Sequence, residues 1–292
     1  MEEKQTDRRS IISFDLDMTL LDHRTYRIPD SAMNAVERLR RQHRIVIASG
    51  RDMDNYYSCS FRDQLHPDAI IHMNGTKVTV GNELIYNHFM DRALLKKLLF
   101  FAMDHGLSLG ATIDGKDYYT CPETVMEHDR KKWGDVGRRF ADANALLSMP
   151  VRTLAYIGGV EGARLLEEHF PQLKFPMFDG NVGADVVEKE ASKAEGLKHL
   201  CRYWGIDLNH TAAFGDSMND IEMIREAGIG IAMGNGVAGL KQAADYVTAH
   251  IREDGILRAC EHFRWFSAFT DASKNNRKII IDREEGYDGK TV

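Results

Sequence analysis

Several features of membrane, secreted and nucleic-acid-binding proteins are missing from this sequence. No run of roughly 18 or more apolar residues occurs, so we expect no membrane-spanning helix and no membrane partner. Basic residues are not in excess, since the 292-residue chain has a formal net charge of −6. This charge argues against a nucleic-acid backbone as the main partner, although a local site can still attract a small anion. No internal repeat or low-complexity tract occurs.

Cysteine is also scarce. Cys59, Cys121, Cys201 and Cys260 are far apart and have neither disulfide nor metal-ligand spacing. Residues 1–9 are charged and lead directly into an apolar segment, without a signal-peptide core. The lack of disulfide spacing and the lack of a signal-peptide core both favour a cytoplasmic protein. We expect it to be a monomer or a homodimer.

An apolar segment that ends in two acids organises the chain. Residues 11–14 predict a strand buried on both faces, and Asp15, Asp17 and Thr19 follow it. Two carboxylates at the end of a buried strand are unfavourable unless a cation or a proton compensates them. Mg²⁺ takes oxygen ligands and keeps waters that a phosphate can replace. Alone, however, such a motif also fits a strand end followed by an acid in a turn.

Predicted strands and helices alternate in both end regions of the chain, residues 1–82 and 189–267. This alternation predicts an α/β fold with a parallel sheet and helices on both faces. Its further strands are expected at residues 45–48, 69–71, 211–214, 229–233 and 245–248. Polar residues follow several of them, at Ser49-Gly50, Asn74-Gly75 and Asp216 to Asn219. Because ligands bind beyond the carboxyl ends of parallel strands, these residues are candidates for one shared site.

Between the two α/β regions, the pattern changes to that of an α+β insert. Helices are expected at residues 91–105 and 161–170, with a mostly helical stretch at 123–147. Strands are expected at residues 107–113, 117–121, 152–157, 173–178 and 185–188. The expected domains are a core of residues 1–82 and 189–267, an insert of residues 83–188 and a polar tail of residues 268–292.

The order of these motifs resembles that of the haloacid dehalogenase superfamily. The resemblance rests on Asp15-Leu16-Asp17-Met18-Thr19, Ser49-Gly50-Arg51, Lys193 and the stretch from Gly215 to Asp220. The insert, with Asn74-Gly75 before it, resembles the Cof-type branch of sugar-phosphate phosphatases. The resemblance implies a Rossmann-like core, a mobile cap formed by the insert, a Mg²⁺ cofactor and hydrolysis of phosphate monoesters. A small phosphorylated metabolite is the implied substrate.

The resemblance also implies a role for each motif residue. Asp15 would be the nucleophile that forms an aspartyl-phosphate, and Asp17 the general acid and base, for which its pKa must be raised. Mg²⁺ would be held by Asp15, the backbone carbonyl of Asp17 and Asp216, with Asp220 in support. Arg51 is expected to form a structural ion pair. The phosphate- and substrate-binding residues would be Leu16, Thr19, Ser49, Gly50, Asn74, Gly75, Lys193 and Asn219.

One departure from the family pattern leaves alternatives open. The family usually has glycine where this chain has Met18, and a side chain there restricts φ and can reshape the loop. Two other functions stand beside the phosphatase, and Met18 favours only the second of them. One is a phosphosugar mutase, in which the aspartyl-phosphate returns its group to the sugar. The other is a regulator that binds phosphometabolites without hydrolysing them.

Overall fold

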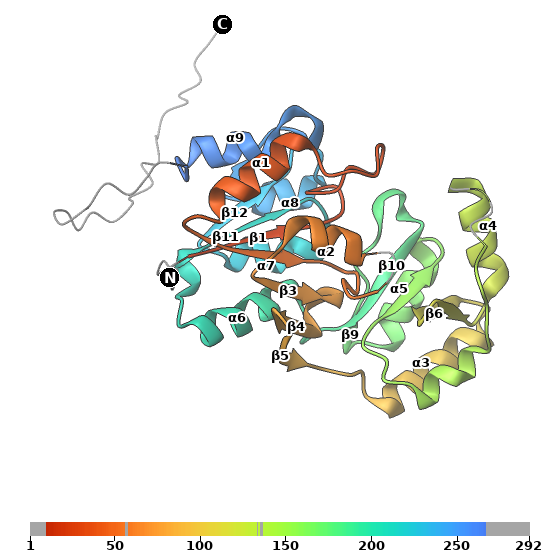
Figure 1. Ribbon diagram of the computed structural model, residues 1–292. Coiled ribbons are helices and arrows are strands. Elements are labelled where there is room, and N and C mark those ends of the chain that lie inside the picture. Colours follow the sequence, from red (N-terminus) through yellow and green to blue (C-terminus); the bar gives the residue numbers. More distant parts are fainter. Residues whose placement is uncertain (1–9, 56–57, 133, 135–136, 267–292) are drawn as a thin grey trace, which may run out of the picture.

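The structure is a computed structural model that describes residues 10–55, 58–132, 134 and 137–266. Within this part of the chain the strands form one sheet of eight strands and one of five. The large sheet and the small sheet lie side by side, each with its own helices (Figure 1). The expected polar tail of residues 268–292 and the loose start of residues 1–9 lie outside the described residues.

The large sheet is mostly parallel. Its order is β13-β12-β11-β1-β2-β3-β4-β5, and only the pairings β3–β4 and β4–β5 are antiparallel. The bounds are β1 Ile11–Asp15, β2 Arg44–Ala48, β3 Ala69–His72, β4 Lys77–Val80, β5 Glu83–Asn87, β11 Thr211–Gly215, β12 Ile229–Ala232 and β13 Tyr246–Val247. The central strands are buried on both faces, as their apolar sequences predict.

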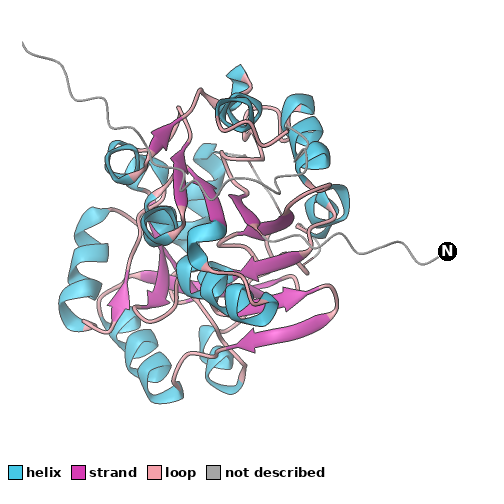
Figure 2. Cartoon of the chain, turned by 90° about the vertical axis from the view of Figure 1, so that its left-hand side faces the viewer, coloured by secondary structure: helices cyan, strands magenta, loops and turns pink. Residues whose placement is uncertain are grey.

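Helices cover both faces of the large sheet, as expected, and Figure 2 shows them around the strands. On one face, Ile12 and Phe14 of β1 pack with α1 (Asp30–Leu39), α2 (Cys59–Leu65) and α9 (Gly255–His262). On the other face, Ile11 packs with α6 (Lys193–Trp204), α7 (Ile221–Glu226) and α8 (Ala238–Ala243). The alternation along β1 therefore supplies two apolar cores.

The insert forms the small sheet, which we call the cap sheet. Its order is β7-β6-β8-β10-β9, and all its pairings are antiparallel. Its strands are β6 Ser108–Ile113, β7 Lys116–Tyr119, β8 Leu154–Ile157, β9 Leu173–Lys174 and β10 Gly183–Glu188. Its helices are α3 Arg92–Asp104, α4 Pro122–Lys132 and α5 Val160–His169. Short 3₁₀ turns occupy Met73–Gly75, Ala143–Ser148, Asp179–Asn181, Leu208–His210, Met218–Asp220 and Ile251–Glu253.

Three expectations for the insert differ from the structure. The boundary expected at residue 83 falls inside the large sheet, because β5 pairs with β4 across a hairpin. The stretch 123–147 is not one helix, since α4 ends at Lys132 and the next described turn is Ala143–Ser148. The strand expected at 173–178 is only Leu173–Lys174. The division into domains otherwise stays a prediction.

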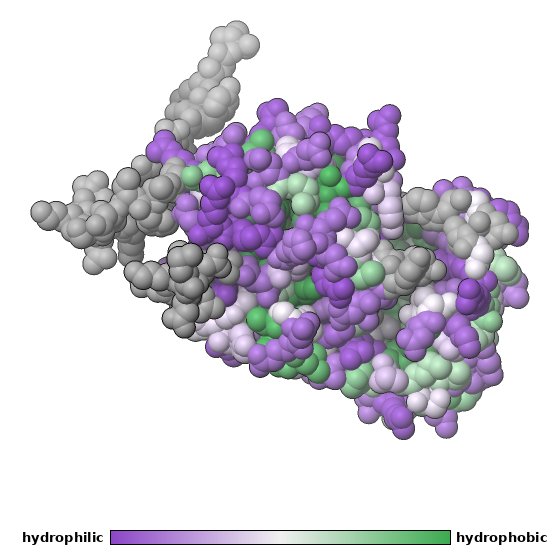
Figure 3. Space-filling model, viewed as in Figure 1, coloured by the Kyte–Doolittle hydropathy of each residue, from purple (hydrophilic) through white to green (hydrophobic). Residues whose placement is uncertain are grey.

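One face of the described chain is mainly polar. On the face in Figure 3, hydrophilic side chains dominate and hydrophobic ones form small, scattered patches. Among the described residues, no helix combines the length and the apolar character needed to cross a membrane.

Candidate active site

The carboxyl ends of β1 and β11 meet at one edge of the large sheet. Asp15 is the last residue of β1, and Asp216 directly follows β11, which pairs with β1 in parallel. One ligand oxygen from each of Asp15, Asp216 and Asp220 lies within 4.8 Å of the others. The structure therefore brings together acids that are about two hundred residues apart in the sequence.

Lys193 reaches this acid cluster from the first turn of α6. Ser192 caps the helix by accepting a hydrogen bond from the backbone of Glu195. The Lys193 side chain is fully buried, and its Nζ donates to Asp15 Oδ1 and to Asp220 Oδ1, both at 2.6 Å. Burial opposes the charge of Lys193, but attraction to Asp15 and Asp220 outweighs burial and raises the pKa of Lys193.

The charges of this cluster do not balance without a further cation. Three carboxylates and one ammonium group give a formal charge of −2 when all are ionised. Burial raises the pKa of Asp15 to about 7, because it outweighs the attraction of Lys193 and adds to the repulsion from Asp220. Burial, with repulsion from Asp15 and Asp220, raises the pKa of Asp216 well above its usual range. The donor set and its charge fit one divalent cation with oxygen ligands.

Asp220 is held more firmly than the other two acids. Its Oδ2 accepts hydrogen bonds from the backbone amides of Asp216 and Ser217, both at 3.0 Å. Gly215 permits this approach, since a Cβ at Gly215 would lie 2.6 Å from the Asp220 side chain. With Lys193 on its other oxygen, Asp220 fixes the loop that carries Asp216. This geometry suits the supporting role expected for Asp220.

Asp17 forms a pair with Arg51 instead of lying among the acids. Arg51 Nε is 2.8 Å from Asp17 Oδ2, and Arg51 Nη2 is 2.5 Å from Asp17 Oδ1. His23 Nε2 also lies 2.6 Å from Asp17 Oδ1. Burial would raise the pKa of Asp17, but the hydrogen bond with His23 and the charge of Arg51 lower it to about 2. This shift is opposite to the raised pKa that proton transfer by Asp17 requires.

Asn74 and Asn219 belong to a directed chain of hydrogen bonds. Ser217 Oγ donates to Asn219 Oδ1 at 2.6 Å, and Asn219 Nδ2 donates to Asn74 Oδ1 at 3.1 Å. Asn74 Nδ2 then donates to Oδ2 of Asp185, a residue of cap strand β10, at 2.9 Å. Burial raises the pKa of Asp185. The sequence analysis missed Asp185, although an acid in the otherwise apolar stretch GADVV was a signal.

The other predicted binding residues line the same edge of the sheet in different ways. The hydroxyl of Ser49 is buried and accepts a hydrogen bond from the backbone of Arg51 at 3.0 Å. The Leu16 side chain is fully buried in the core, so only its backbone can contact a ligand.

Gly75 is needed for packing, because at φ 92° a Cβ there would lie 1.9 Å from the carbonyl oxygen of Ser192. Thr19 Oγ1 lies 3.5 Å from Asp216 Oδ1.

Met18 adopts the conformation that a glycine would adopt. Its φ is 59°, in the left-handed region. Its amide donates to Leu21 O at 2.8 Å, and its carbonyl accepts from Asn235 Nδ2 at 2.7 Å. These contacts hold the loop between Asp17 and Thr19, and the Met18 side chain packs partly buried against the core.

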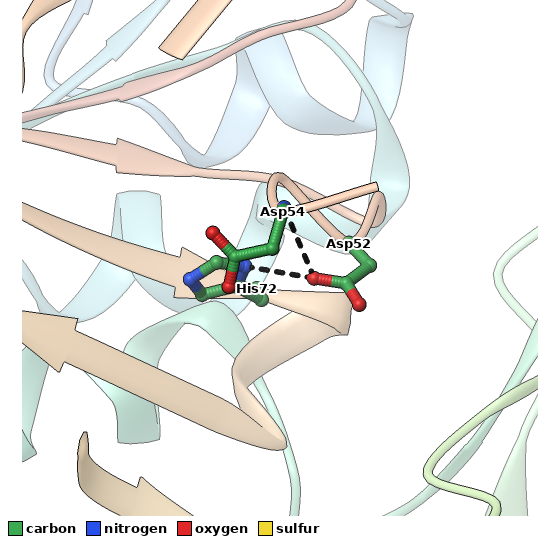
Figure 4. A group of neighbouring side chains, drawn as sticks. All are labelled: Asp52, Asp54 and His72. Carbon is green, nitrogen blue, oxygen red and sulfur yellow. Dashed lines mark hydrogen bonds and ion pairs between the residues drawn. The ribbon is translucent and has the colours of Figure 1, made fainter. Parts of the chain in front are cut away.

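A second acidic cluster lies beside Arg51, formed by Asp52, Asp54 and His72 (Figure 4). Its acids already have cations, since Lys77 Nζ lies 2.6 Å from Asp54 Oδ2 and 3.4 Å from Asp52 Oδ1. The Nδ1 of the buried His72 accepts a hydrogen bond from the backbone of the residue after Asp52. A second cation, Arg62, has its Nη1 2.7 Å from Asp54 Oδ1, so the two carboxylates face two cations, and the cluster holds the loop after Arg51 against β3 and β4.

The comparisons with known proteins agree with this geometry. A model of the family described as haloacid dehalogenase-like hydrolase matches residues 12–260. YkrA of Bacillus subtilis (strain 168), provisionally named a phosphatase, is 34% identical over 85% of this chain and 95% of its own. YitU of the same organism, named a 5-amino-6-(5-phospho-D-ribitylamino)uracil phosphatase, is 25% identical over 87% of this chain and 97% of its own.

A solved structure of a phosphatase is also similar to this chain. The sugar phosphatase BT4131, described as subclass IIB of the superfamily, superimposes with a TM-score of 0.79 at 30% identity. The superposition covers 88% of this chain and 99% of BT4131. Together with the family match over most of the chain, this likeness identifies the protein as a phosphatase that belongs to the haloacid dehalogenase-like hydrolase family.

Proposed function

We propose that this phosphatase hydrolyses small phosphate monoesters, with sugar and polyol phosphates as substrates, through an aspartyl-phosphate on Asp15. The observation that carries the proposal is the buried Lys193, whose Nζ joins Asp15 and Asp220 beside Asp216. A Mg²⁺ ion bound by Asp15, the Asp17 carbonyl and Asp216 would place positive charge beside the phosphoryl oxygens. The formal charge of −2 supports a divalent cofactor.

The proposed reaction has two steps, and in both of them Asp17 must exchange a proton, for which it has to leave the contacts with His23 and Arg51 that lower its pKa in this structure. In the first step, an oxygen of Asp15 bonds to phosphorus, the bond to the ester oxygen breaks, and Asp17 gives that oxygen a proton. In the second step, water attacks the aspartyl-phosphate and gives a proton to Asp17, and the Asp15–phosphorus bond breaks. Since Lys193 holds Oδ1 of Asp15, Oδ2 is the proposed nucleophile.

The phosphoryl group has several donors within the same region. Lys193 would neutralise part of its charge, and the Ser49 hydroxyl and the Gly50 amide would bind its oxygens. Asn219, which contacts Asn74, would bind a further oxygen. The names of two relatives support the substrate class, since BT4131 is called a sugar phosphatase and YitU acts on a phosphorylated ribityl compound.

Phosphate release in the presence of Mg²⁺ tests this proposal. A panel of hexose, pentose and polyol phosphates, with p-nitrophenyl phosphate, should include esters from which the protein releases phosphate. Asp15→Asn should lower kcat by roughly 10³-fold or more, because the amide cannot form the covalent intermediate. Asp114→Asn is a matched control, since Asp114 is an exposed acid in the β6–β7 turn with φ 50°. Equal turnover by wild type and Asp15→Asn would remove Asp15 from its role.

The same panel separates the alternatives. A mutase would give isomerised sugar phosphate without net phosphate release. A regulator would bind esters tightly and hydrolyse none at any Mg²⁺ concentration. A cytoplasmic location and a monomeric or homodimeric state stay predictions.

A further inference from the structure

Asp185 lies on the face of the cap sheet that is turned toward the core. Along β10, Ala184 and Val186 pack into the apolar cluster shared with α3 and α5, so Asp185 points to the opposite face. Strand register places Asp185 beside Ala155, and Ala155 beside Gly110, on this face. Gly110 is followed on this row by the buried Tyr119, whose ring lies against it, so Asp185 shares the face with two small residues and one tyrosine.

The carboxyl group of Asp185 lies beside three residues of the proposed phosphate site. Asn74 Nδ2 donates to its Oδ2 at 2.9 Å, and Asn219 Nδ2 donates to Oδ1 of the same Asn74 at 3.1 Å. A Cβ added to Gly50 would lie 3.2 Å from Oδ2 of Asp185. Asp185 comes from the cap, whereas Gly50, Asn74 and Asn219 belong to the core, and the charge of Lys193 also acts on the carboxyl group of Asp185.

The place of Asp185 in the fold suits contact with the leaving group, because the core holds the proposed phosphate site and Asp185 reaches it from the cap. Asp17, the proposed proton donor to the leaving oxygen, is close enough to influence the carboxyl group of Asp185 electrostatically. A carboxylate has about four lone-pair sites, and the hydrogen bond from Asn74 uses one of them. A negative charge here weakens phosphate binding unless it has a compensating contact with the rest of the substrate.

We propose that Asp185 determines specificity for the leaving group. Its carboxylate accepts hydrogen bonds from hydroxyl groups of a sugar or polyol and disfavours leaving groups that carry a second negative charge. This inference rests on the proposed phosphatase function. It adds the residue that distinguishes hydroxyl-rich esters from acidic ones.

The test compares kcat/KM for three esters in the presence of Mg²⁺. These are the sugar or polyol phosphate that wild type hydrolyses fastest, p-nitrophenyl phosphate and phosphoglycolate. Asp185→Asn keeps an oxygen for Asn74 but replaces the other oxygen with a donor, whereas Asp185→Ala removes both contacts. We expect Asp185→Asn to lower the ratio of sugar phosphate to p-nitrophenyl phosphate by ~10- to 100-fold, mainly through KM. The ratio of phosphoglycolate to p-nitrophenyl phosphate should rise.

Two controls make the outcome decisive. Asp114→Asn removes an exposed acid from the same cap and should leave both ratios within about 2-fold of wild type. Asp185→Ala should show the same change of ratios even if its overall activity is lower. Unchanged ratios in both Asp185 variants, or equal losses on all three esters, would overturn the inference. Failure of wild type to release phosphate from any ester would instead overturn the proposed function, and the inference with it.

Discussion

Nζ of Lys193 lies 2.6 Å from Oδ1 of Asp15, although 178 positions separate the two residues in the sequence. The whole cap lies between them along the chain. Their contact is therefore made by the core itself, where the first turn of α6 meets the end of β1. Because the Lys193–Asp15 ion pair does not depend on cap residues, the sequence of the cap can change without breaking it.

Lys193→Met should destabilise the protein and remove activity. The variant leaves the carboxylates of Asp15 and Asp220 buried without their shared cation. Breaking such a buried pair lowers the free energy of unfolding by about 3–5 kcal/mol. We expect this loss in urea unfolding at pH 8 without Mg²⁺, together with a fall in kcat of at least ~10²-fold.

Lys198→Met is the matched control for Lys193. Lys198 lies on the same helix, is 30% exposed, and pairs with Glu195 and Glu226 at the surface. Its loss should change the free energy of unfolding by less than about 1 kcal/mol. Similar effects of the two substitutions would show that Lys193 is an ordinary surface lysine.

The sequence allowed the core and its acid cluster to be predicted, for a clear reason. Parallel strands bring their carboxyl ends to one edge, so Asp15 and Asp216 had to converge once the strands were identified. The sequence did not predict His23 or Asp185 in the site. His23 depends on the fold of a loop, and Asp185 on how the cap sits against the core. The boundary expected at residue 83 falls at the first residue of β5, which pairs with β4 in the large sheet, and the division into domains stays a prediction.

Mg²⁺ should bind more tightly as the pH rises through neutrality. Without metal, burial raises the pKa of Asp15 to about 7 and also raises that of Asp216. Both carboxyl groups then hold protons that Mg²⁺ must displace, so affinity should increase up to about 10-fold per pH unit for each proton released. At a fixed Mg²⁺ concentration, the rise in Tm should be larger at pH 8 than at pH 6.

Asp216→Asn provides the control for this pH dependence. It removes one of the proposed ligands and one of the titrating groups, so it should weaken Mg²⁺ binding and flatten its dependence on pH. Titration calorimetry in two buffers of different ionisation enthalpy would measure the protons released. No proton release by wild type between pH 6 and pH 8 would contradict the prediction.

Arg51→Gln should reduce the loss of stability in acid. The pKa of Asp17 is lowered to about 2 in the folded protein, below its usual value of 3.8. A lowered pKa stabilises the fold above pH 3.8, and this contribution disappears as the pH falls through 2. It amounts to at most about 2 kcal/mol. Wild type should therefore be more stable than Arg51→Gln near neutral pH, and the difference should shrink below pH 4.

Arg62→Gln distinguishes this effect from the general loss of an arginine. Arg62 pairs with Asp54 and Asp63 near the same loop but does not contact Asp17. Its substitution should change the stability curve between pH 4 and pH 2 less than Arg51→Gln does, because Asp54 keeps its contact with Lys77. A loss of stability below pH 4 that is as large in Arg51→Gln as in wild type would show that Arg51 does not set the protonation of Asp17.

Met18→Gly should leave catalysis almost unchanged. Met18 already has a φ of 59° and is held by Leu21 and Asn235, so glycine should keep the same loop. The left-handed conformation costs methionine about 1–2 kcal/mol, but its side chain packs against the core, so the two effects oppose each other. Met18→Val should be clearly destabilised, because a β-branched side chain fits this φ poorly. We expect Met18→Gly to retain kcat within about 3-fold in phosphate release. A large gain in activity would instead make Met18 a restraint on turnover, as a non-hydrolysing regulator would require.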